Sequence, residues 1–452
     1  MTNSPTPATR DVSGIPVREG AHRKPIHLAA HFPGVNHNTV WSDPAARSQV
    51  EFDSFVYLAR AAERAKFDFF FLAEGLRLRE HLGRIHDLDV VGRPDTFTVL
   101  SALAAVTDRI GLAGTINTTF NEPFDVARQF ATLDHLSAGR AAWNMVTSSD
   151  AFTGENFRRG GFLAHADRYH RADEFITVAR KFWDGWGRGE IVHHGAQFDV
   201  RGGAPLPPSP QGRPVLLQAG DSGEGRDFAA AQADAIFTRH GSLESGRSFY
   251  ADVKRRAADR GRNPDHLKVF PGAAAVVGDT PEEAQDKARD IRRRQVGPQT
   301  ALNFLEQVWG RELQSFDPDG PLPDVEPVYE TTAVQGRVLH ADPREIVAAY
   351  RARAEAGGLS IRELVIELNT RPQFVGTAQQ VADEIDTFIQ ADAADGFILV
   401  PHLTPTGLDE FIDGVVPLLQ ERGAFRTEYE GTTLREHLGL PLPEETAAQR
   451  AG

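Results

Sequence analysis

The chain has 452 residues, of which 40% are hydrophobic and 25% charged, enough to bury the core of one large barrel with insertions. Its 49 basic and 63 acidic residues give a formal net charge of −14 without a basic block, which disfavours nucleic acid and anionic membranes as partners. The absence of cysteine excludes disulfides, thiolate metal sites and a cysteine nucleophile. No apolar run has the length of a membrane span, and residues 1–24 are expected to form a flexible tail rather than a signal peptide. We therefore expect a cytoplasmic protein.

Eight short apolar runs are expected to be β-strands. They lie at residues 25–32, 68–73, 110–117, 140–148, 214–220, 235–240, 267–277 and 396–401. The runs are apolar nearly throughout, as in parallel strands that are covered on both faces. Helical patterns lie between them, so the sequence predicts an α/β fold. The count of eight favours a (β/α)₈ TIM barrel over a doubly wound sheet.

Local signals predict where several helices begin. Asp43-Pro44 is expected to open the first helix, and Asp95 to cap the second. The third is expected over residues 123–136. Thr377 and the glutamine three residues later form the pattern of a capping box. A last helix is expected at about 408–421.

Two long segments interrupt the alternation of strands and helices. Residues 149–213 lie between strands four and five, and residues 281–375 between strands seven and eight. Long excursions of a barrel usually surround its catalytic mouth, so residues 281–375 are a candidate lid. We expect a single barrel domain over residues 25–425, followed by a C-terminal extension over residues 426–452.

Polar side chains at the ends of three predicted strands are candidates for a binding site. Glu74 follows the second strand, Asn117 and Thr118 end the third, and Asn144 lies near the end of the fourth. The carboxyl ends of barrel strands point into the catalytic mouth, and small hydrogen-bonding groups there suit a heteroaromatic ring such as a flavin. A helix-capping or core role is the alternative for each residue taken singly.

Ser222 lies between two glycines in Gly220-Asp221-Ser222-Gly223, directly after the fifth strand and before a helix. Backbone N–H groups and a hydroxyl at a helix N-terminus can bind a phosphate, and a simply capped helix is the alternative. The same four residues resemble the nucleophile segment of trypsin-like proteases. Those proteases are all-β, so a strand-to-helix turn in an alternating βα chain argues against that interpretation.

His165 and Tyr169 lie four residues apart, which places both side chains on one face of a helix. No third ligand is in range and Arg168 is adjacent, so contact with an anion is favoured over a metal site, and a solvated face is the alternative. His31, His37 and His240 lie at or near strand ends and could reach the mouth. Neither a Gly-x-Gly-x-x-Gly motif after a strand nor a Walker A motif is found, which disfavours a nicotinamide cofactor in a Rossmann cleft.

These residues lie in segments that resemble the bacterial-luciferase-like flavin monooxygenases. The resemblance covers about residues 25–425, and it is closest to the branch with the nitrilotriacetate, dibenzothiophene-sulfone and long-chain alkane monooxygenases. The most specific stretches are NEPF at 121–124, ARQFATLDHLSAGR at 127–140 and WNMVTS at 143–148. They are supported by GRPDTF at 92–97, the segment from His165 to Tyr169, and QAGDSG at 218–223.

The resemblance implies a TIM barrel with insertions, often a homodimer or homotetramer, that binds FMN noncovalently. The residues themselves predict no metal site. The resemblance also implies that FMNH₂ from a separate NAD(P)H-dependent flavin reductase reacts with O₂ to a C4a-peroxide, which oxygenates a small amine, organosulfur or alkane substrate. It places flavin contacts on Glu74, Asn117, Thr118, Asn144, His165, Tyr169 and Ser222, and His37 is a candidate proton donor.

Two positions depart from the family pattern. Position 117 is Asn where a small hydroxyl residue is expected, and position 221 is Asp where Ser or Gly is usual. An acidic residue beside a phosphate site is unfavourable, so Asp221 must point away or Ser222 contributes less. Two alternatives remain open: an oxidoreductase that uses coenzyme F420 on the same barrel, and a non-catalytic flavin-binding barrel. The substrate is also open; a basic segment at the mouth would suit a carboxylate or sulfonate, with a solvated loop as the alternative (Arg77, Arg79, His81 and Arg84).

Overall fold

Eight parallel strands close into a barrel in the computed structural model, which describes residues 23–33, 39–76, 80–81, 84–85, 94–147, 156–157, 165–328, 342–370 and 373–443. The barrel strands pair in the order β1-β2-β5-β6-β9-β10-β11-β13, and β13 pairs with β1 to close the ring. The predicted eight-stranded barrel is therefore confirmed. Its strands are β1 His27–Phe32, β2 Phe69–Leu72, β5 Gly111–Asn117, β6 Ala141–Val146, β9 Val215–Ala219, β10 Ala235–Thr238, β11 Lys268–Val277 and β13 Gly396–Leu399.

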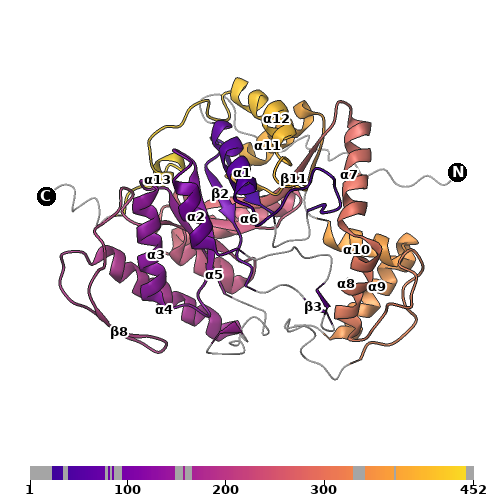
Figure 1. Ribbon diagram of the computed structural model, residues 1–452, viewed down its shortest axis with the longest axis horizontal. Coiled ribbons are helices and arrows are strands. Elements are labelled where there is room, and N and C mark those ends of the chain that lie inside the picture. Colours follow the sequence, from indigo (N-terminus) through magenta and orange to yellow (C-terminus); the bar gives the residue numbers. More distant parts are fainter. Residues whose placement is uncertain are drawn as a thin grey trace.

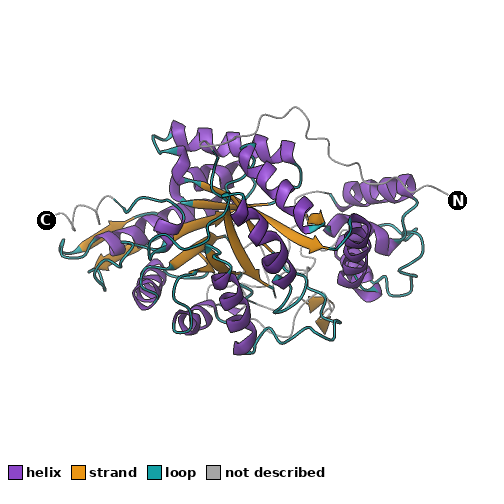
Figure 2. Cartoon of the chain, turned by 90° about the horizontal axis from the view of Figure 1, so that it is seen from above, coloured by secondary structure: helices purple, strands orange, loops and turns teal. Residues whose placement is uncertain are grey.

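A layer of helices surrounds the strands, as Figures 1 and 2 show. The helices that follow barrel strands are α1 Phe52–Arg64, α2 Thr96–Ala104, α3 Pro123–Leu136, α4 His165–Asp184, α5 Gly223–Gln232, α6 Leu243–Asp259, α7 Pro281–Gln295 and α12 Asp409–Glu421, while α11 Ala378–Gln390 follows the short strand β12. The Asp95 cap, the third helix and the Thr377 capping box are as predicted. Short elements complete the chain: β3 Glu80–His81, β4 Arg84–Ile85, β7 Ile191–His194, β8 Asp199–Gly202, β12 Gln373–Gly376 and a 3₁₀ turn at Pro264–His266.

The predicted start of the first helix at Asp43-Pro44 is wrong. Asp43 instead caps a turn, in which its carboxylate accepts a hydrogen bond from Ala45 N at 2.9 Å, and α1 begins at Phe52. The backbone of this segment pairs with the loop after β13, through Val40 N to His402 O and Arg47 N to Thr404 O, both at 2.8 Å. A helix over the same residues would remove these bonds, so the tertiary pairing outweighs the local signal.

The barrel interior is filled by side chains that alternate along the strands. Phe69, Phe71, Ala113, Ala142, Leu217, Phe270 and Ile398 form one buried cluster inside the ring. Their neighbours on the same strands point outward and pack against the helices. Residues two positions further along the strands, toward their carboxyl ends, therefore face the mouth of the barrel.

The C-terminal extension forms the floor of the barrel. Helix α13 (Leu434–His437) and the residues after it place Leu434, Leu438 and Leu440 in the interior cluster. Leu434 N also donates to Gly139 O at 3.0 Å, at the amino end of β6. The extension thus seals the end of the barrel opposite the mouth.

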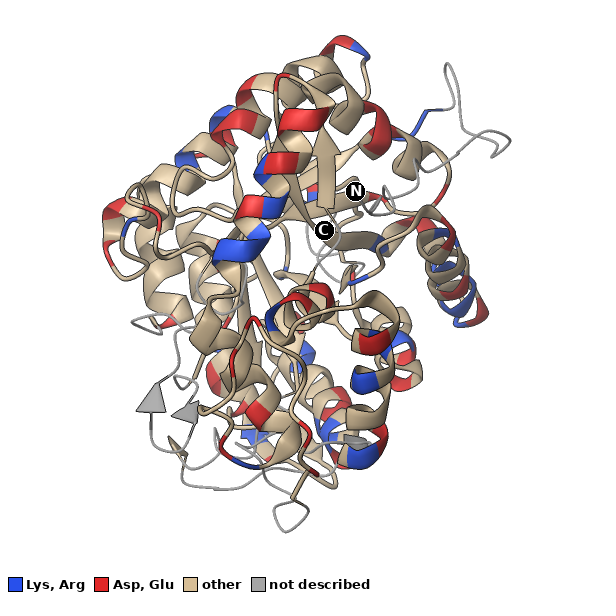
Figure 3. Ribbon diagram, turned by 90° about the vertical axis from the view of Figure 1, so that its right-hand side faces the viewer, with Lys and Arg blue, Asp and Glu red and all other residues tan. Residues whose placement is uncertain are grey.

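Three helices between β11 and β12 form a separate cluster. They are α8 Pro298–Trp309, α9 Pro343–Gly357 and α10 Ile361–Asn369, and they share a core around Leu305, Trp309 and Ile361. In Figure 1 they stand beside the barrel, connected to it by α7. Helix α7 changes from acidic residues in its first turn to Arg292, Arg293 and Arg294 in its last, a distribution that complements the helix dipole (Figure 3).

Candidate active site

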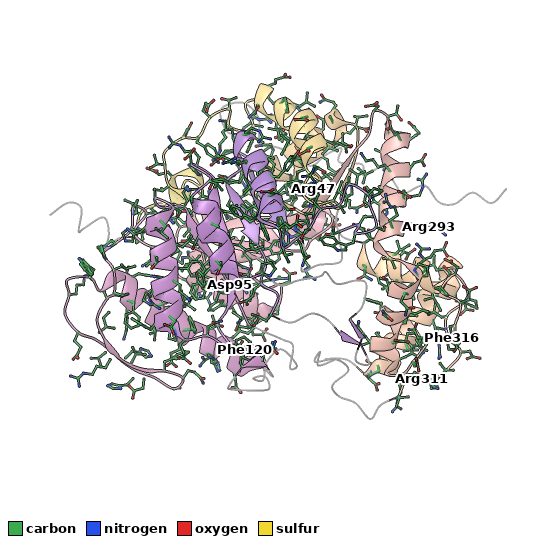
Figure 4. The ribbon with its side chains drawn as sticks, viewed as in Figure 1. Arg47, Asp95, Phe120, Arg293, Arg311 and Phe316 are labelled. Carbon is green, nitrogen blue, oxygen red and sulfur yellow. The ribbon has the colours of Figure 1, made fainter. Side chains whose placement is uncertain are left out.

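The mouth is built at the carboxyl ends of the barrel strands. Figure 4 places Asp95 and Phe120 at this end, just before α2 and α3 begin. Side chains two or four positions apart on a strand point to the same face. Because Ala113 and Ala142 point into the barrel, so do the side chains of Thr115 and Asn117 on β5 and of Asn144 on β6. All three are buried. The upper layer of the interior is therefore polar, above an apolar layer.

Asn144 presents an unpartnered acceptor to this mouth. Its amide nitrogen donates to Thr115 Oγ1 at 2.9 Å, on the neighbouring strand in register. Its Oδ1 is buried and has no hydrogen-bond partner among the residues that the structure describes. A buried amide oxygen without a partner is costly, so this position favours a ligand that carries a hydrogen-bond donor.

Glu74 follows β2 and is held by one residue of the next strand. Its Oε2 accepts two hydrogen bonds from Asn117, from the backbone N at 3.0 Å and from Nδ2 at 2.9 Å. Burial raises the pKa of Glu74 to about 7; the two bonds from Asn117 oppose this rise, and the charge of Asp95 adds to it. At neutral pH this carboxyl can therefore accept or donate a proton.

Both the oxygen and the nitrogen of the Asn117 side-chain amide form hydrogen bonds within the protein. Oδ1 accepts from Phe120 N at 2.8 Å, while Nδ2 donates to Glu74. The Asn117 carbonyl accepts from Asn121 Nδ2 at 2.8 Å. Thr118, next in the chain, donates from its backbone to Val146 O at 2.9 Å. The unexpected Asn at 117 therefore orders the loop after β5 and orients Glu74.

The turn from β9 into α5 brings a helix N-terminus close to Tyr169. Ser222 is the N-cap of α5, and its hydroxyl accepts from Gly225 N at 3.1 Å. A Cβ on Gly220 would lie 2.6 Å from Gln218 Nε2 and 3.2 Å from the Tyr169 hydroxyl, whereas a Cβ on Gly223 would meet no described atom within 4 Å. Tyr169 of α4 thus reaches the same helix terminus, where backbone N–H groups and the dipole favour an anion.

Asp221 does not oppose an anion at this terminus. Its carboxylate accepts a hydrogen bond from the Thr238 hydroxyl of β10 at 2.7 Å. Its backbone carbonyl accepts from Arg226 Nε at 3.0 Å. The side chain is therefore directed toward β10, which resolves the conflict that the sequence raises.

Several predicted residues cannot be placed at the mouth. His37, Arg77 and Arg79 lie outside the described residues, as do the side chains of His81, Arg84 and His165; the backbone of His165 begins α4. His240 lies away from the mouth, because its ring packs against Phe249 of α6 and its Nε2 lies 3.2 Å from Ala393 O. His31, in contrast, lies two positions after the interior residue Ala29 on β1, so its side chain faces the barrel interior, where it packs against Phe71.

Sequence reasoning missed three polar residues of this region. Thr115 orients Asn144, and Gln218 is a buried residue of β9 whose Oε1 has no partner among the described residues. Arg171 of α4 donates to the loop after β5. Strand periodicity could have indicated Thr115, which lies two positions before Asn117. Nothing local distinguishes Arg171 from a solvated helical arginine.

Fold and mouth together define an α/β-barrel enzyme with a polar binding site at the carboxyl ends of its strands. Residues 30–396 match the luciferase-like monooxygenase family, and the chain belongs to that family. It is a monooxygenase, as predicted. None of its helices, within the ranges described, has the length and apolar character needed to cross a membrane.

The similarity extends over nearly the whole chain. The protein is 40% identical to N-acetyl-S-(2-succino)cysteine monooxygenase of Bacillus subtilis (strain 168), over 93% of this chain and 98% of that protein. It is also 40% identical to nitrilotriacetate monooxygenase component A of Aminobacter aminovorans, over 90% and 95% of the two chains. The crystal structure of a riboflavin lyase with modified FMN and riboflavin is similar, with a TM-score of 0.75, 30% identity and coverage of 93% and 97%.

Proposed function

We propose that this protein is the oxygenating component of a two-component monooxygenase that uses FMNH₂ and O₂ to oxygenate a small organic substrate. The observation that carries the proposal is the pairing of two features at one mouth. The first is a helix N-terminus with open space beside Gly223, and the second is a buried acceptor on Asn144. A flavin mononucleotide has a phosphate for the first and ring N–H groups for the second.

The phosphate would be held by the first turn of α5. Ser222 and the backbone N–H groups of Gly223 and Glu224 lie at the positive end of the helix dipole. The Tyr169 hydroxyl would donate to the same phosphate, and the space beside Gly223 is open. His165, one turn before Tyr169 on α4, is proposed as a further contact.

The flavin ring would be held by the polar layer of the mouth. Asn144 would accept from a ring N–H, and Thr118 and Glu74 would contact the ring from β5 and β2. Asn117 would act indirectly, because both ends of its amide are already bonded within the protein. Reduced FMN would supply the oxygen-activating chemistry when bound.

The protein's part is to orient the ring, exclude water and handle protons. The apolar interior layer and the floor formed by α13 close the barrel beneath the site. Glu74, with a pKa near 7, can hold a proton beside the ring. His37 remains a proposed proton donor, and the 281–375 segment a proposed lid over the mouth.

A separate NAD(P)H-dependent flavin reductase is the proposed partner, consistent with the designation of the nitrilotriacetate enzyme as a component A. We further propose a cytoplasmic homodimer or homotetramer. The names of the two relatives denote a tertiary amine and a thioether as substrates, so amines and organosulfur compounds are the first classes to test, before alkanes.

The test is an aerobic assay in which a flavin reductase supplies FMNH₂ and candidate amines, organosulfur compounds and alkanes are added singly. We expect substrate-dependent O₂ consumption and a product heavier by one oxygen atom, with ¹⁸O incorporated from ¹⁸O₂. Reactions with catalase, and reactions without the protein, control for free peroxide from FMNH₂.

Two results would overturn the proposal. Oxidation or reduction of coenzyme F420 without O₂ would show the alternative barrel oxidoreductase. Tight FMN binding without turnover across all three classes would favour a non-catalytic flavin-binding protein.

A further inference from the structure

Arg171 is a buried guanidinium that joins α4 to the loop after β5. Its Nε donates to Thr118 O and its Nη2 to Asn121 O, both at 3.0 Å. Its planar group also lies over the Phe198 ring, with Cζ 4.3 Å from the ring centroid. One face is therefore covered by the β7–β8 segment, while the edge of the guanidinium binds two carbonyls of the same loop.

These two carbonyls belong to the loop that orders the candidate ring site. Asn121 donates back to Asn117 O at 2.8 Å, and Asn117 in turn donates twice to Glu74. A continuous series of hydrogen bonds therefore runs from Arg171 through Asn121 and Asn117 to the Glu74 carboxyl. The other direct target, Thr118, is itself a proposed ring contact.

The position of Arg171 on α4 makes this series relevant to the whole site. Tyr169, two residues earlier, faces the N-terminus of α5. Residues two apart on a helix point in different directions, so one turn of α4 contacts the proposed phosphate end through Tyr169 and the proposed ring end through Arg171. A rigid bidentate group suits this task better than the flexible ammonium of a lysine.

We propose that Arg171 is a positioning residue: it holds the 117–121 loop at a set distance from α4, and thereby places Thr118 and Glu74 for the flavin ring. This inference rests on the proposed function insofar as the ring is a flavin. The hydrogen bonds by which Arg171 holds the loop are made within the protein and do not require a ligand.

The experiment compares Arg171→Met and Arg171→Lys with matched changes at Arg180. Arg180 lies on the same helix and is partly buried, but it donates to the carbonyl of Gln232, the last residue of α5, at 2.7 Å. Two quantities are measured on the full-length protein. They are hydrogen–deuterium exchange of the peptide covering residues 117–123, and the affinity for FMN by fluorescence titration.

We expect Arg171→Met to accelerate exchange in residues 117–123 and to weaken FMN binding about tenfold, because binding must then order the loop. Arg171→Lys should recover part of both effects. Arg180→Met should lower the melting temperature but leave exchange of this peptide and FMN affinity unchanged. Equal exchange and affinity in the Arg171→Met and Arg180→Met proteins would overturn the proposal.

The two proposals can fail separately. If the unaltered protein does not bind FMN, the proposed function fails, while the exchange comparison still decides whether Arg171 holds the loop. If FMN binds but Arg171→Met leaves the exchange of residues 117–123 unchanged, only the positioning role is overturned.

Discussion

Asn117 donates two hydrogen bonds to a single oxygen of Glu74, although the two residues are 43 positions apart. The amide that does so is fixed in orientation, because its own oxygen accepts from Phe120 N. The carboxyl of Glu74 is thus held by its neighbour strand rather than by solvent. Its pKa is still raised to about 7, since burial outweighs these two bonds.

We therefore expect the effect of Glu74→Gln on the stability of the protein to depend on pH. The pKa is about 7 in the folded protein and about 4.3 in an unfolded chain, so the protonated form stabilises the fold below the unfolded pKa, and this stabilisation is lost as pH rises through 7. Glutamine does not ionise, so the stability of the variant relative to the unaltered protein should increase from about pH 4.3 to about pH 7 and stay constant at higher pH. Melting temperatures across this range test it, with Glu421→Gln on the surface of α12 as control. A constant difference at all pH values would contradict the expectation.

Loss of a hydroxyl at the phosphate end should weaken flavin binding. Ser222→Ala and Tyr169→Phe should each reduce FMNH₂ affinity by about 1–2 kcal/mol, since each removes one hydrogen bond to a charged group. Ser360→Ala is the matched control, because Ser360 caps α10 by the same bond, to Glu363 N at 3.2 Å, within the separate helical cluster. Anaerobic fluorescence titration measures the affinity. If neither variant differs from the control, the phosphate site lies elsewhere.

The floor of the barrel should be needed for stability. Leu438→Ala should cost about 2–5 kcal/mol of unfolding free energy, because it leaves a cavity within the interior cluster. Leu136→Ala, at a side chain that is 63% exposed, should change the stability by less than about 0.5 kcal/mol. Urea unfolding followed by circular dichroism compares the two. A similar cost for both would mean that the extension packs only loosely beneath the barrel.

A buried ion pair connects the extension to β2. Arg426 Nη2 lies 2.6 Å from Asp68 Oδ1, and His27 Nδ1 lies 2.9 Å from the same oxygen. Burial alone would raise the pKa of Asp68, but Arg426 and His27 outweigh it and lower the pKa to about 2. Arg426→Met leaves this carboxylate buried without its cation, which should cost about 3–5 kcal/mol at pH 7.

The cost of Arg426→Met should depend on pH. With a folded pKa near 2 and an unfolded pKa near 3.9, Asp68 stabilises the fold above pH 4, and this stabilisation is lost as pH falls through 2. The difference between variant and unaltered protein should therefore shrink between pH 4 and pH 2.5. Urea unfolding at both values provides the measurement. A deficit independent of pH would indicate lost packing of the Arg426 side chain rather than lost charge pairing.

The barrel strands and most helix ends could be predicted from the sequence because their signals are local. A continuous apolar run specifies a doubly covered strand, and Asp95 or Thr377 caps a helix through bonds to residues three positions away. Where a distant segment competes, as at Asp43, the local signal fails.

In the candidate site, too, local sequence signals predict some features and contacts between distant segments decide the others. The sequence by itself determined that Glu74, Thr118 and Asn144 stand at or near strand ends, since the length of each apolar run places them there. Only the tertiary structure decided which hydrogen bonds these residues form. Asn117 donates to the Glu74 carboxylate, and the Asp221 carboxylate accepts from the Thr238 hydroxyl. Arg171 donates to the Thr118 carbonyl, 53 positions away in the sequence. A hydrogen bond needs a partner within about 3 Å. The pairing of β2 with β5 and of β9 with β10, and the packing of α4 against the loop after β5, bring those partners together.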